Sequence, residues 1–492
     1  MTFEEFSDLA KGYNVIPLSK RMLADTLTPV SAYLHLREGS RSSFLLESVE
    51  GGERFARYSF IGRDPVALLT CRDRTTTIRE MPPGIPPSAR SSTENFFDIV
   101  SGLVGRYSQP PLPSLPRFRG GLVGFIGYDA IRFIEKIPAA AGNDADLDDS
   151  ILGLFTSILA FDHLKHEIIT IVNVLIDREK DLRRQYDAAH EEIARLESIL
   201  SKASGRALEF QASTARLAEE TGRKEFEDVV KTAKQYIIDG DIFQVVLSRR
   251  FSTEISGDAF NAYRALRVIN PSPYLYYLDF EGFKVIGSSP EILVRTENGV
   301  AEVYPIAGTR RRGVSDEEDA ALEAELLADE KELAEHVMLV DLGRNDLGRV
   351  CETGSVRVDQ LMKIVRYSHV MHIASRVVGR MAEGKTCVDV LKAAFPAGTV
   401  SGAPKIRAME IIDELEKSRR GIYAGGVGYF DFSGTMDMCI AIRTMFSKNG
   451  RIYLQAGAGI VADSDPAKEY DETSNKAKAL IEALRMAEGI SR

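Results

Sequence analysis

Two segments of the chain each carry a pair of glutamates three residues apart. Glu332 and Glu335 lie in a segment with strong helical periodicity, and Glu469 and Glu472 lie in another, with Lys476 four residues further on. Residues three or four positions apart share one face of a helix, so each segment can present two carboxylates to one point. Such a pair can hold a cation, or it can meet solvent and neighbouring basic residues.

A magnesium ion suits the two glutamate pairs if they face each other. Four carboxylates placed close together would repel one another strongly without a cation between them. Mg²⁺ takes oxygen ligands, keeps several waters and binds through one or two carboxylates together with an anionic substrate. Glutamates at this spacing more often form a solvated helix face paired with Lys or Arg. Spacing alone leaves both interpretations open.

Glycine-rich segments late in the chain are candidates for holding an anion. A predicted strand ends in three small residues, Gly457, Ala458 and Gly459, where a ligand can approach the backbone N–H groups. Arg443 lies in an otherwise apolar strand, and a buried arginine needs an anionic partner. Its guanidinium group matches a carboxylate in shape and charge. The partner is either a bound ligand or an acidic side chain in a structural ion pair.

The elements that must position these residues alternate without a strict βαβ order, which favours an α+β fold. No Rossmann or P-loop signature is present. Asp465-Pro466 is typical of an N-cap followed by a first-turn proline, so a helix is expected to begin there. The other main elements predicted are short strands over about 28–77, helices over about 178–201, 225–239 and 259–268, and a strand over about 243–251.

The small and polar residues from about 203 to 221 indicate a linker. We therefore expect an N-terminal domain over residues 1–202, a linker over 203–221 and a catalytic domain over 222–492. The length of 492 residues is sufficient for two or three average domains.

Composition excludes several classes of protein. The net charge of -10 argues against a nucleic-acid binder, which needs a basic face. No stretch approaches the roughly 20 apolar residues of a membrane-spanning helix, and the acidic N-terminal segment lacks the apolar run of a secretory signal. Four cysteines without a CxxC pair indicate reduced thiols. We expect a cytoplasmic protein that binds neither nucleic acid nor membrane.

Sequence blocks between about residues 225 and 486 resemble the chorismate-utilising enzymes and follow that family's order. Among them are PIAGTRRRG, LGRNDLGRV, FPAGTVSGAPK, QAGAGIVADSDP and EYDETSNKAKAL. The N-terminal region resembles the corresponding domain of the family's anthranilate synthases, chiefly through Leu45-Leu46-Glu47-Ser48. The resemblance implies a large two-sheet β-sandwich flanked by helices, with an N-terminal regulatory region packed against it.

The same resemblance implies roles for individual residues. Chorismate is the implied substrate and Mg²⁺ the implied cofactor, held by Glu335 and Glu472 with Glu332 and Glu469 beside them. Glu291 matches the general acid for the departing hydroxyl, and His372 matches the histidine that assists pyruvate elimination, although an isolated histidine is more often a core residue. Thr399 and Lys476 complete the implied catalytic set. The implied chorismate-binding residues are Gly308, Thr309, Tyr423, Arg443, Gly457, Ala458 and Gly459.

Two positions separate members of this family by reaction. Water-using relatives have a lysine base where this chain has Gln244, and aminodeoxychorismate synthases typically have a nucleophilic lysine where it has Ala307. An ammonia-using enzyme that forms anthranilate, in the first step of tryptophan biosynthesis, is therefore expected. The alternatives are aminodeoxyisochorismate synthase, aminodeoxychorismate synthase component I, and a tryptophan- or chorismate-binding regulatory protein without activity.

Two partners follow from the resemblance. No cysteine lies in a GxCxG nucleophile elbow, so a separate glutamine amidotransferase subunit, giving a hetero-oligomer, is expected to supply ammonia. L-tryptophan is expected as a feedback inhibitor, although the first of the two segments implied to bind it could simply be a strand packed on the second. The implied tryptophan-site residues are Leu46, Glu47, Ser48, Pro273, Tyr274 and Leu275.

Overall fold

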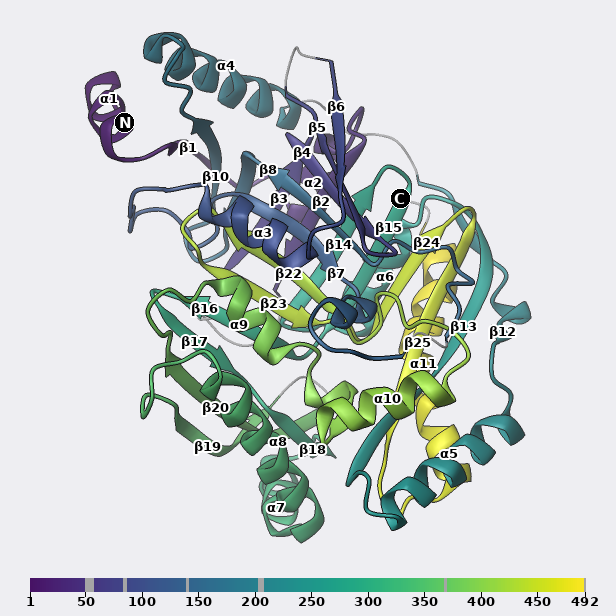
Figure 1. The fold of residues 1–492 in the computed structure, drawn as a ribbon. Helices are drawn as coiled ribbons and strands as arrows, with labels where there is room; N and C mark the ends of the chain where they lie inside the picture. Colours follow the sequence, from purple (N-terminus) through teal and green to yellow (C-terminus); the bar gives the residue numbers. More distant parts are fainter. Residues whose placement is uncertain (49–56, 83–85, 139–140, 202–207, 367–369, 491–492) are drawn as a thin grey trace.

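Two large antiparallel sheets form the centre of the computed structural model (Figure 1). The structure describes residues 1–48, 57–82, 86–138, 141–201, 208–366 and 370–490. In these ranges the first sheet has the strand order β1 (Val15–Leu23), β10 (Glu167–Leu175), β9 (Ser157–Asp162), β3 (Tyr58–Arg63), β2 (Ser42–Glu47), β14 (Tyr274–Phe280), β15 (Phe283–Ser289), β24 (Thr444–Lys448), β25 (Arg451–Ile460), β13 (Gln244–Gly257) and β11 (Phe210–Ala212). Two short strands, β12 (Ala218–Glu219) and β21 (Gly402–Ala403), also pair with β13.

The second sheet lies against the first. Its described strands follow the order β18 (Ile306–Arg311), β20 (Val370–Arg380), β17 (Val300–Val303), β16 (Ile292–Glu297), β23 (Met436–Ile440), β22 (Gly426–Asp431), β7 (Gly121–Ile126), β8 (Ser150–Phe155), β4 (Ala67–Arg72), β5 (Thr75–Glu80) and β6 (Ser88–Ser92), with β19 (Arg357–Arg366) paired to β20. Apolar side chains from both sheets form one buried cluster between them. The ring of Phe44 on β2 meets that of Phe155 on β8 edge to face, with centroids 4.7 Å apart. The predicted α+β sandwich is confirmed.

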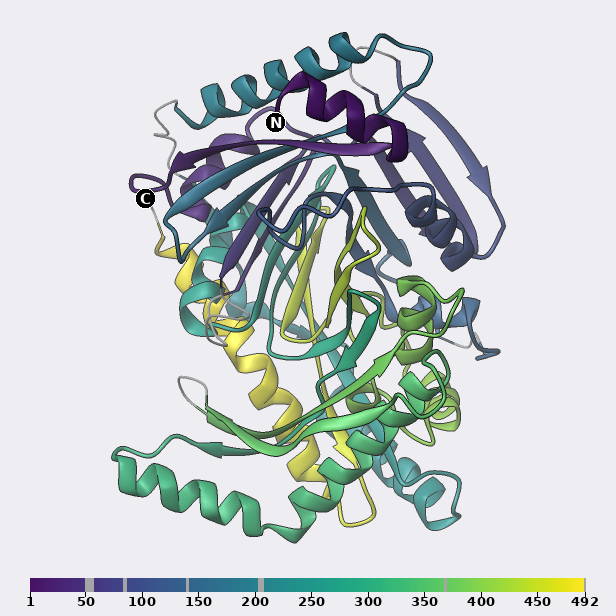
Figure 2. The same ribbon diagram turned by 90° about the vertical axis from the view of Figure 1, so that its left-hand side faces the viewer.

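Helices cover the outer faces of both sheets. One apolar cluster joins the first sheet to α1 (Phe3–Gly12), α2 (Pro29–Leu36), α4 (Leu182–Leu200), α6 (Phe260–Ile269) and α11 (Pro466–Glu488). Another contains residues of both sheets and joins them to α3 (Phe96–Gly105), α9 (Cys387–Ala394), α10 (Lys405–Leu415) and part of α5 (Arg223–Ile238), of which α5 and α10 contact β13 of the first sheet. Figure 2 shows α4 at one end of the molecule and α7 (Asp316–Ala328) with α8 (Glu330–Gly348) at the other.

None of the helices in the described ranges is both long and apolar enough to cross a membrane.

Strand pairing crosses the boundary expected between the two domains. Strand β2 of the N-terminal region pairs with β14, with Leu46 opposite Tyr276. In the other sheet β7 pairs with β22, with Gly124 opposite Gly428. The N-terminal region is therefore joined to the rest by backbone hydrogen bonds in both sheets, and a change in its position is transmitted directly to strands of the other half.

The segment expected to be a linker, residues 203–221, is built into the first sheet over its described part. Strand β11 pairs with β13 through Ala212 and Ile255, and β12 pairs with it through Glu219 and Phe251. The free edge of the long strand β13 offers unpaired N–H and C=O groups, which these segments satisfy. Small polar residues mark a segment without a core of its own, but they do not reveal that an edge strand is available to pair with it.

Phe44→Ala tests the contact between the sheets. Removing this fully buried ring is expected to lower the free energy of unfolding by about 3–5 kcal/mol, the usual cost of truncating a buried phenylalanine. Phe243→Ala is the control, because Phe243 is 74% exposed, and its effect should stay within about 0.5 kcal/mol. Urea unfolding followed by circular dichroism measures both, and equal values for the two variants would contradict this account of the core.

Candidate active site

A cavity of about 450 Å³ opens where strands of both sheets meet α8 and α11. Strands β13 and β25 come from the first sheet, and β18 and β20 from the second. Many residues expected from the sequence line it: Glu291, Thr309, Glu335, His372, Thr399, Tyr423, Arg443, Gly457, Gly459 and Lys476. Residues far apart in the chain are thus brought to one concave site, and its volume is typical of a site that binds a small molecule.

The carboxyl group of Glu291 is placed to act as an acid. It follows β15, and the hydroxyl of Thr399 donates a hydrogen bond to its Oε2 at 3.1 Å. Burial raises the pKa of Glu291, while the bond from Thr399 and the positive charges of Arg443 and Lys476 act in the opposite direction. Because burial prevails, Glu291 holds its proton to a higher pH than an ordinary glutamate does.

His372 is held by the backbone of the neighbouring strand. Its Nδ1 lies 2.8 Å from the carbonyl oxygen of Gly308 and 3.0 Å from the hydroxyl of Thr309. A carbonyl oxygen only accepts, so Nδ1 carries a proton and Nε2 is the accepting nitrogen of the neutral ring. Burial lowers the pKa of His372 and keeps it neutral, although its bond to Gly308 opposes this. Gly308 sits at an irregularity of the β18–β20 pairing with φ of 67°.

Arg443 is a cation aimed into the cavity. Its backbone has φ of 49°, a conformation that costs free energy for a residue with a side chain and that often marks a functional site. Burial lowers its pKa, with Glu291 and Tyr423 acting against this. In the part of the chain that the structure describes, no carboxylate lies within ion-pair distance of Arg443. A structural ion pair is therefore not what holds it, and the carboxylate of a ligand would be a favourable partner.

Small residues on β25 let other groups come close. A Cβ atom on Gly457 would lie 2.5 Å from the hydroxyl of Tyr423, and one on Gly459 would lie 2.7 Å from Nε2 of Gln244. The ammonium group of Lys476 donates to the carbonyl oxygen of Gly457 at 3.0 Å. Ala458 belongs to the buried core and is not among the described residues that line the cavity.

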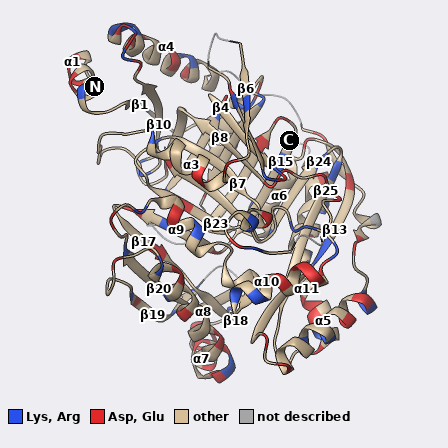
Figure 3. Ribbon diagram, in the orientation of Figure 1, with Lys and Arg blue, Asp and Glu red and all other residues tan. Residues whose placement is uncertain are grey.

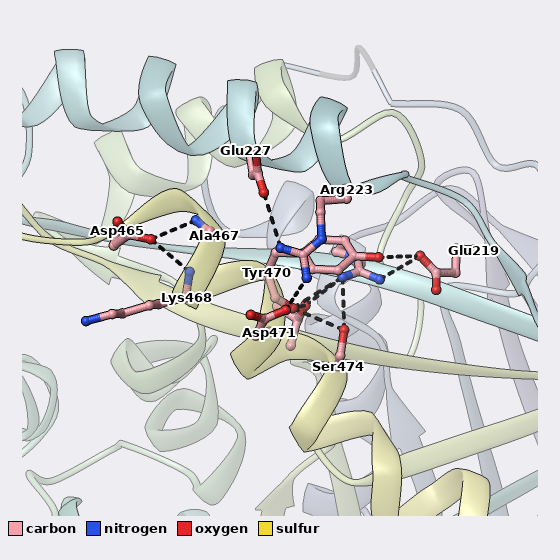
Figure 4. Close-up of polar contacts among 11 residues, drawn as sticks. Glu219, Arg223, Glu227, Asp465, Ala467, Lys468, Tyr470, Asp471 and Ser474 are labelled. Atoms are coloured by element: carbon pink, nitrogen blue, oxygen red, sulfur yellow. Dashed lines mark hydrogen bonds and ion pairs between the residues drawn. The ribbon is translucent and has the colours of Figure 1, made fainter.

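The glutamate pairs lie at the starts of two capped helices. Asp329 accepts hydrogen bonds from N–H groups at the start of α8. Asp465 does the same for α11, as predicted, through Ala467 and Lys468 (Figure 4). These caps satisfy N–H groups that a helix leaves unpaired, and they fix where each helix begins. Each glutamate pair therefore lies within the first two turns, close to the positive end of its helix dipole.

The four carboxylates differ in surroundings. Glu335 lines the cavity, whereas Glu472 lies at its rim and pairs with Lys476 at 2.6 Å. Burial and repulsion from Glu335 raise the pKa of Glu332. Burial also raises the pKa of Glu469, which the hydrogen bond from Ser464 opposes and the charge of Glu472 reinforces.

The donor set suits a magnesium ion that shares its ligands with a substrate. Within the ranges described, no three acidic, histidine or cysteine side chains come together closely enough to hold a metal by themselves. The two pairs thus do not form a closed cage of four carboxylates. Mg²⁺ does not need one, because it binds through one or two carboxylates plus waters and an anionic ligand. Glu335 in the cavity wall and Glu472, which lines an adjoining pocket together with Arg443 and Lys476, fit this requirement.

A family model described as chorismate binding enzyme matches residues 42–482. The chain belongs to the chorismate-binding enzymes. It is 50% identical to anthranilate synthase component 1 of Acetivibrio thermocellus, with 99% of this chain and 98% of that protein covered. It is 48% identical to anthranilate synthase component 1 of Aquifex aeolicus (strain VF5), with 99% and 98% covered.

Solved structures agree with the fold. The crystal structure of anthranilate synthase component I from Streptococcus pneumoniae TIGR4 superposes with a TM-score of 0.74 at 38% identity, covering 94% of this chain and 99% of that one. The menaquinone-specific isochorismate synthase of Escherichia coli superposes with a TM-score of 0.72, covering 98% of both chains. At 20% identity the second likeness establishes the fold alone.

A second, smaller cavity of about 60 Å³ lies between the sheets of this chorismate-binding enzyme. Its walls include every residue expected to bind tryptophan: Leu46, Glu47, Ser48, Pro273, Tyr274 and Leu275. The hydroxyl of Ser48 is buried with no hydrogen-bond partner among the described residues, as expected where a ligand would supply one. Pro273 lines both cavities, so one stretch of chain separates them.

Sequence analysis missed several polar residues of the larger cavity. Asn270, Ser272 and Gln455 line it, yet none has a type or spacing that singles it out. Asn270 and Ser272 belong to the block NPSPY (residues 270–274), of which the family resemblance implied only Pro273 and Tyr274, as tryptophan-site residues. The proximity of both cavities to this block arises from the pairing of β14 with β2, which local sequence does not reveal.

Thr399→Val tests the electrostatics of Glu291. The variant removes a hydrogen bond that stabilises the carboxylate, so the pKa of Glu291 is expected to rise above its already raised value. Infrared difference titration of the carboxyl band, with Glu291→Gln as the blank, measures it. Thr309→Val is the matched control, because its hydroxyl contacts His372 instead, and a pKa that falls or stays constant in Thr399→Val would contradict the assignment.

Proposed function

We propose that this chain is the chorismate-converting component of an anthranilate synthase. It adds ammonia to chorismate and then eliminates pyruvate. The observation that carries this proposal is that Gln244 and Ala307 both line the cavity, beside the acid Glu291 and the base His372. In the family these are the two positions at which a lysine base or a lysine nucleophile acts. Because neither position 244 nor position 307 carries a lysine, the nucleophile must be a small molecule that enters the cavity.

Chorismate carries two carboxylates, and the cavity offers two places for them. The guanidinium group of Arg443, which has no ion-pair partner among the described residues, suits one, and Tyr423 and Gly457 line the same cavity. The other faces Glu335 and Glu472, which would hold Mg²⁺. When bound, this ion neutralises the ring carboxylate and supports the negative charge that develops as the ring reacts.

In the first step ammonia forms a C–N bond to the ring as the ring hydroxyl leaves. Glu291 donates its proton to this hydroxyl, which departs as water, and the ring double bonds shift to give aminodeoxyisochorismate. The raised pKa of Glu291 suits this role because the group keeps its proton to a higher pH than an ordinary glutamate does. Thr399 orients the carboxyl group through its hydrogen bond.

In the second step the ring becomes aromatic. The neutral His372 accepts a ring proton at Nε2, the C–O bond to the enolpyruvyl group breaks, and pyruvate leaves after the side chain gains a proton. The carbonyl of Gly308 holds Nδ1–H and therefore directs Nε2 to its task. The lowered pKa of His372 keeps the imidazole unprotonated when the proton must be taken.

Ammonia is proposed to come from glutamine through a separate amidotransferase subunit. The relatives are named as component 1, which supports a second component, and the four cysteines of this chain are all buried and free. Burial raises the pKa of each thiol, which is the opposite of what a nucleophilic cysteine needs. Reduced cysteines also suit the cytoplasm as the place of action.

L-tryptophan is the proposed inhibitor, bound at the smaller cavity. Its volume of about 60 Å³ has room for only a few waters, so binding requires the walls to separate. Two conformations with different affinity for tryptophan are what inhibition requires. Because Pro273 lines both cavities, widening one displaces a wall of the other.

The purified chain with chorismate, magnesium chloride and ammonium chloride tests the proposed reaction. Anthranilate fluorescence and pyruvate are expected to appear together, only with Mg²⁺, and to fall when tryptophan is added. Chromatography identifies other products. A non-aromatic amine as the sole product would show that the chain stops at aminodeoxyisochorismate, and no consumption even with a cognate amidotransferase would refute an enzymatic role.

Ser48→Phe tests the inhibitor site. A phenyl ring fills the smaller cavity, so the tryptophan concentration for half-inhibition is expected to rise by about tenfold or more, about 1.4 kcal/mol of binding free energy. Activity without tryptophan is expected to remain. Ser88→Phe on the exposed edge strand β6 is the control, and unchanged inhibition of Ser48→Phe would place the inhibitor elsewhere.

A further inference from the structure

Two adjacent arginines lie in the middle of β13 and point to opposite faces of the sheet. Arg249 is 1% exposed and Arg250 is 6% exposed. Figure 3 shows β13 with a basic segment beside α11. Successive side chains of a strand alternate between faces, so only one of the two can meet α11. Arg250 instead meets Asp144 and Glu220.

Arg249 contacts the first turns of α11 through several acceptors. Its Nη1 donates to the carbonyl oxygen of Tyr470 at 3.3 Å, to the hydroxyl of Thr473 at 3.1 Å and to that of Ser474 at 3.3 Å. Its guanidinium group lies 3.7 Å from the centre of the Tyr470 ring. Its Nη2 donates to Glu219 at 2.9 Å, and Glu219 also accepts from the hydroxyl of Tyr470 (Figure 4).

These contacts determine the rotation of α11 about its axis. Each residue turns a helix by about 100°, so the face that meets Arg249 lies beside the face that carries Glu469, Glu472 and Lys476. Three acceptors within five residues also oppose sliding of the helix along β13. On the neighbouring face Lys476 reaches the carbonyl oxygen of Gly457 at 3.0 Å, and Glu472 pairs with Lys476 at 2.6 Å. A rotation or slide of α11 would break the contact of Lys476 with Gly457 and would displace the Glu472–Lys476 pair as a unit.

The contact between Arg249 and α11 places a positive charge in the protein interior. The side chain of Arg249 is fully buried, and its acid partner Glu219 is partly exposed. Removing an arginine from water is costly unless its donors are satisfied. Burial lowers the pKa of Arg249, which Tyr470 and Glu219 oppose. An apolar side chain would pack α11 against the sheet at a lower cost, but it would not determine the orientation of the helix.

We propose that Arg249 is a positioning residue of the reaction: by holding Tyr470, Thr473 and Ser474, it orients α11 so that Glu472 and Lys476 face the cavity. The proposal rests on the proposed function for its meaning in catalysis. The orientation itself is testable without turnover. Glu219, on β12, accepts a hydrogen bond from Arg249. The segment expected to be a linker therefore helps to hold Arg249 in place.

Arg249→Met is the main test, with Arg250→Met as its matched control on the same strand. In Arg249→Met the Mg²⁺ concentration for half-maximal activity is expected to rise tenfold or more, within the 10–100-fold range for residues that orient metal ligands. The kcat/KM for chorismate should fall as well. Arg250→Met removes a buried arginine of the same strand and is expected to change neither value by more than about twofold.

Two readouts do not depend on turnover. Mn²⁺ alone, followed by water proton relaxation, is expected to bind Arg249→Met at least tenfold more weakly than the wild type and Arg250→Met. Hydrogen exchange at the amides of residues 466–476 is expected to accelerate in Arg249→Met alone. If chorismate is not turned over by the wild type while these two differences persist, the proposed function fails and the orientation role stands.

Arg249→Lys keeps the test decisive if the methionine variant does not fold. Lysine retains the charge but lacks the planar fork, so it cannot serve the same acceptors at once. An intermediate rise in the Mn²⁺ dissociation constant is expected. A folded Arg249→Met or Arg249→Lys protein that binds Mn²⁺, protects its α11 amides and turns over like Arg250→Met would overturn the proposal, whatever its thermal stability.

Discussion

The register between β13 and β25 determines where the groups of the active site lie. These strands pair over ten positions, from Val245 opposite Ile460 to Glu254 opposite Arg451. Side chains alternate between the two faces of a sheet, so a slip of one residue would exchange the cavity face for the core face. At the correct register Gln244 and Gly459 meet at the cavity, and Arg249 points toward α11. Helices α5, α10 and α11 pack against this pair of strands.

Buried charge is the main cost of this architecture. Arg443 has no ion-pair partner within the described ranges, and Glu291 is buried with only Thr399 as a hydrogen-bond donor. Both groups would be more stable in water. A ligand with a carboxylate for Arg443 and a hydroxyl for Glu291 would provide the missing partners. Its binding free energy would offset the cost of burying the two groups. The site is thus less stable when empty, as expected where function opposes folding.

Local sequence predicted the elements of the site better than their assembly. Asp465-Pro466 correctly predicted the start of α11, and the ExxE spacing correctly placed each glutamate pair on one helix face. Whether the pairs meet depends on the packing of α8 and α11 against different sheets, which no local pattern encodes, and they do not form a closed cage. The contacts of Arg249 with α11 were missed for the same reason, since these partners are more than 200 residues away in the sequence. The family resemblance correctly predicted the two-sheet fold, which local patterns could not, because it carries the long-range pairings with it.

The sharing of strands between the two halves gives the smaller cavity and the larger cavity a direct structural connection. Strand β2 contributes Glu47 to the smaller cavity and pairs with β14, in which Leu275 lies opposite Glu47. The chain just before β14 forms a wall of the larger cavity through Asn270 and Pro273. A ligand that separates β2 from this chain must therefore act on the wall of the active site. The coupling it produces is limited by its difference in affinity for the closed and widened forms. Such coupling is reciprocal, so under the proposed function chorismate would weaken tryptophan binding by the same factor by which tryptophan weakens chorismate binding.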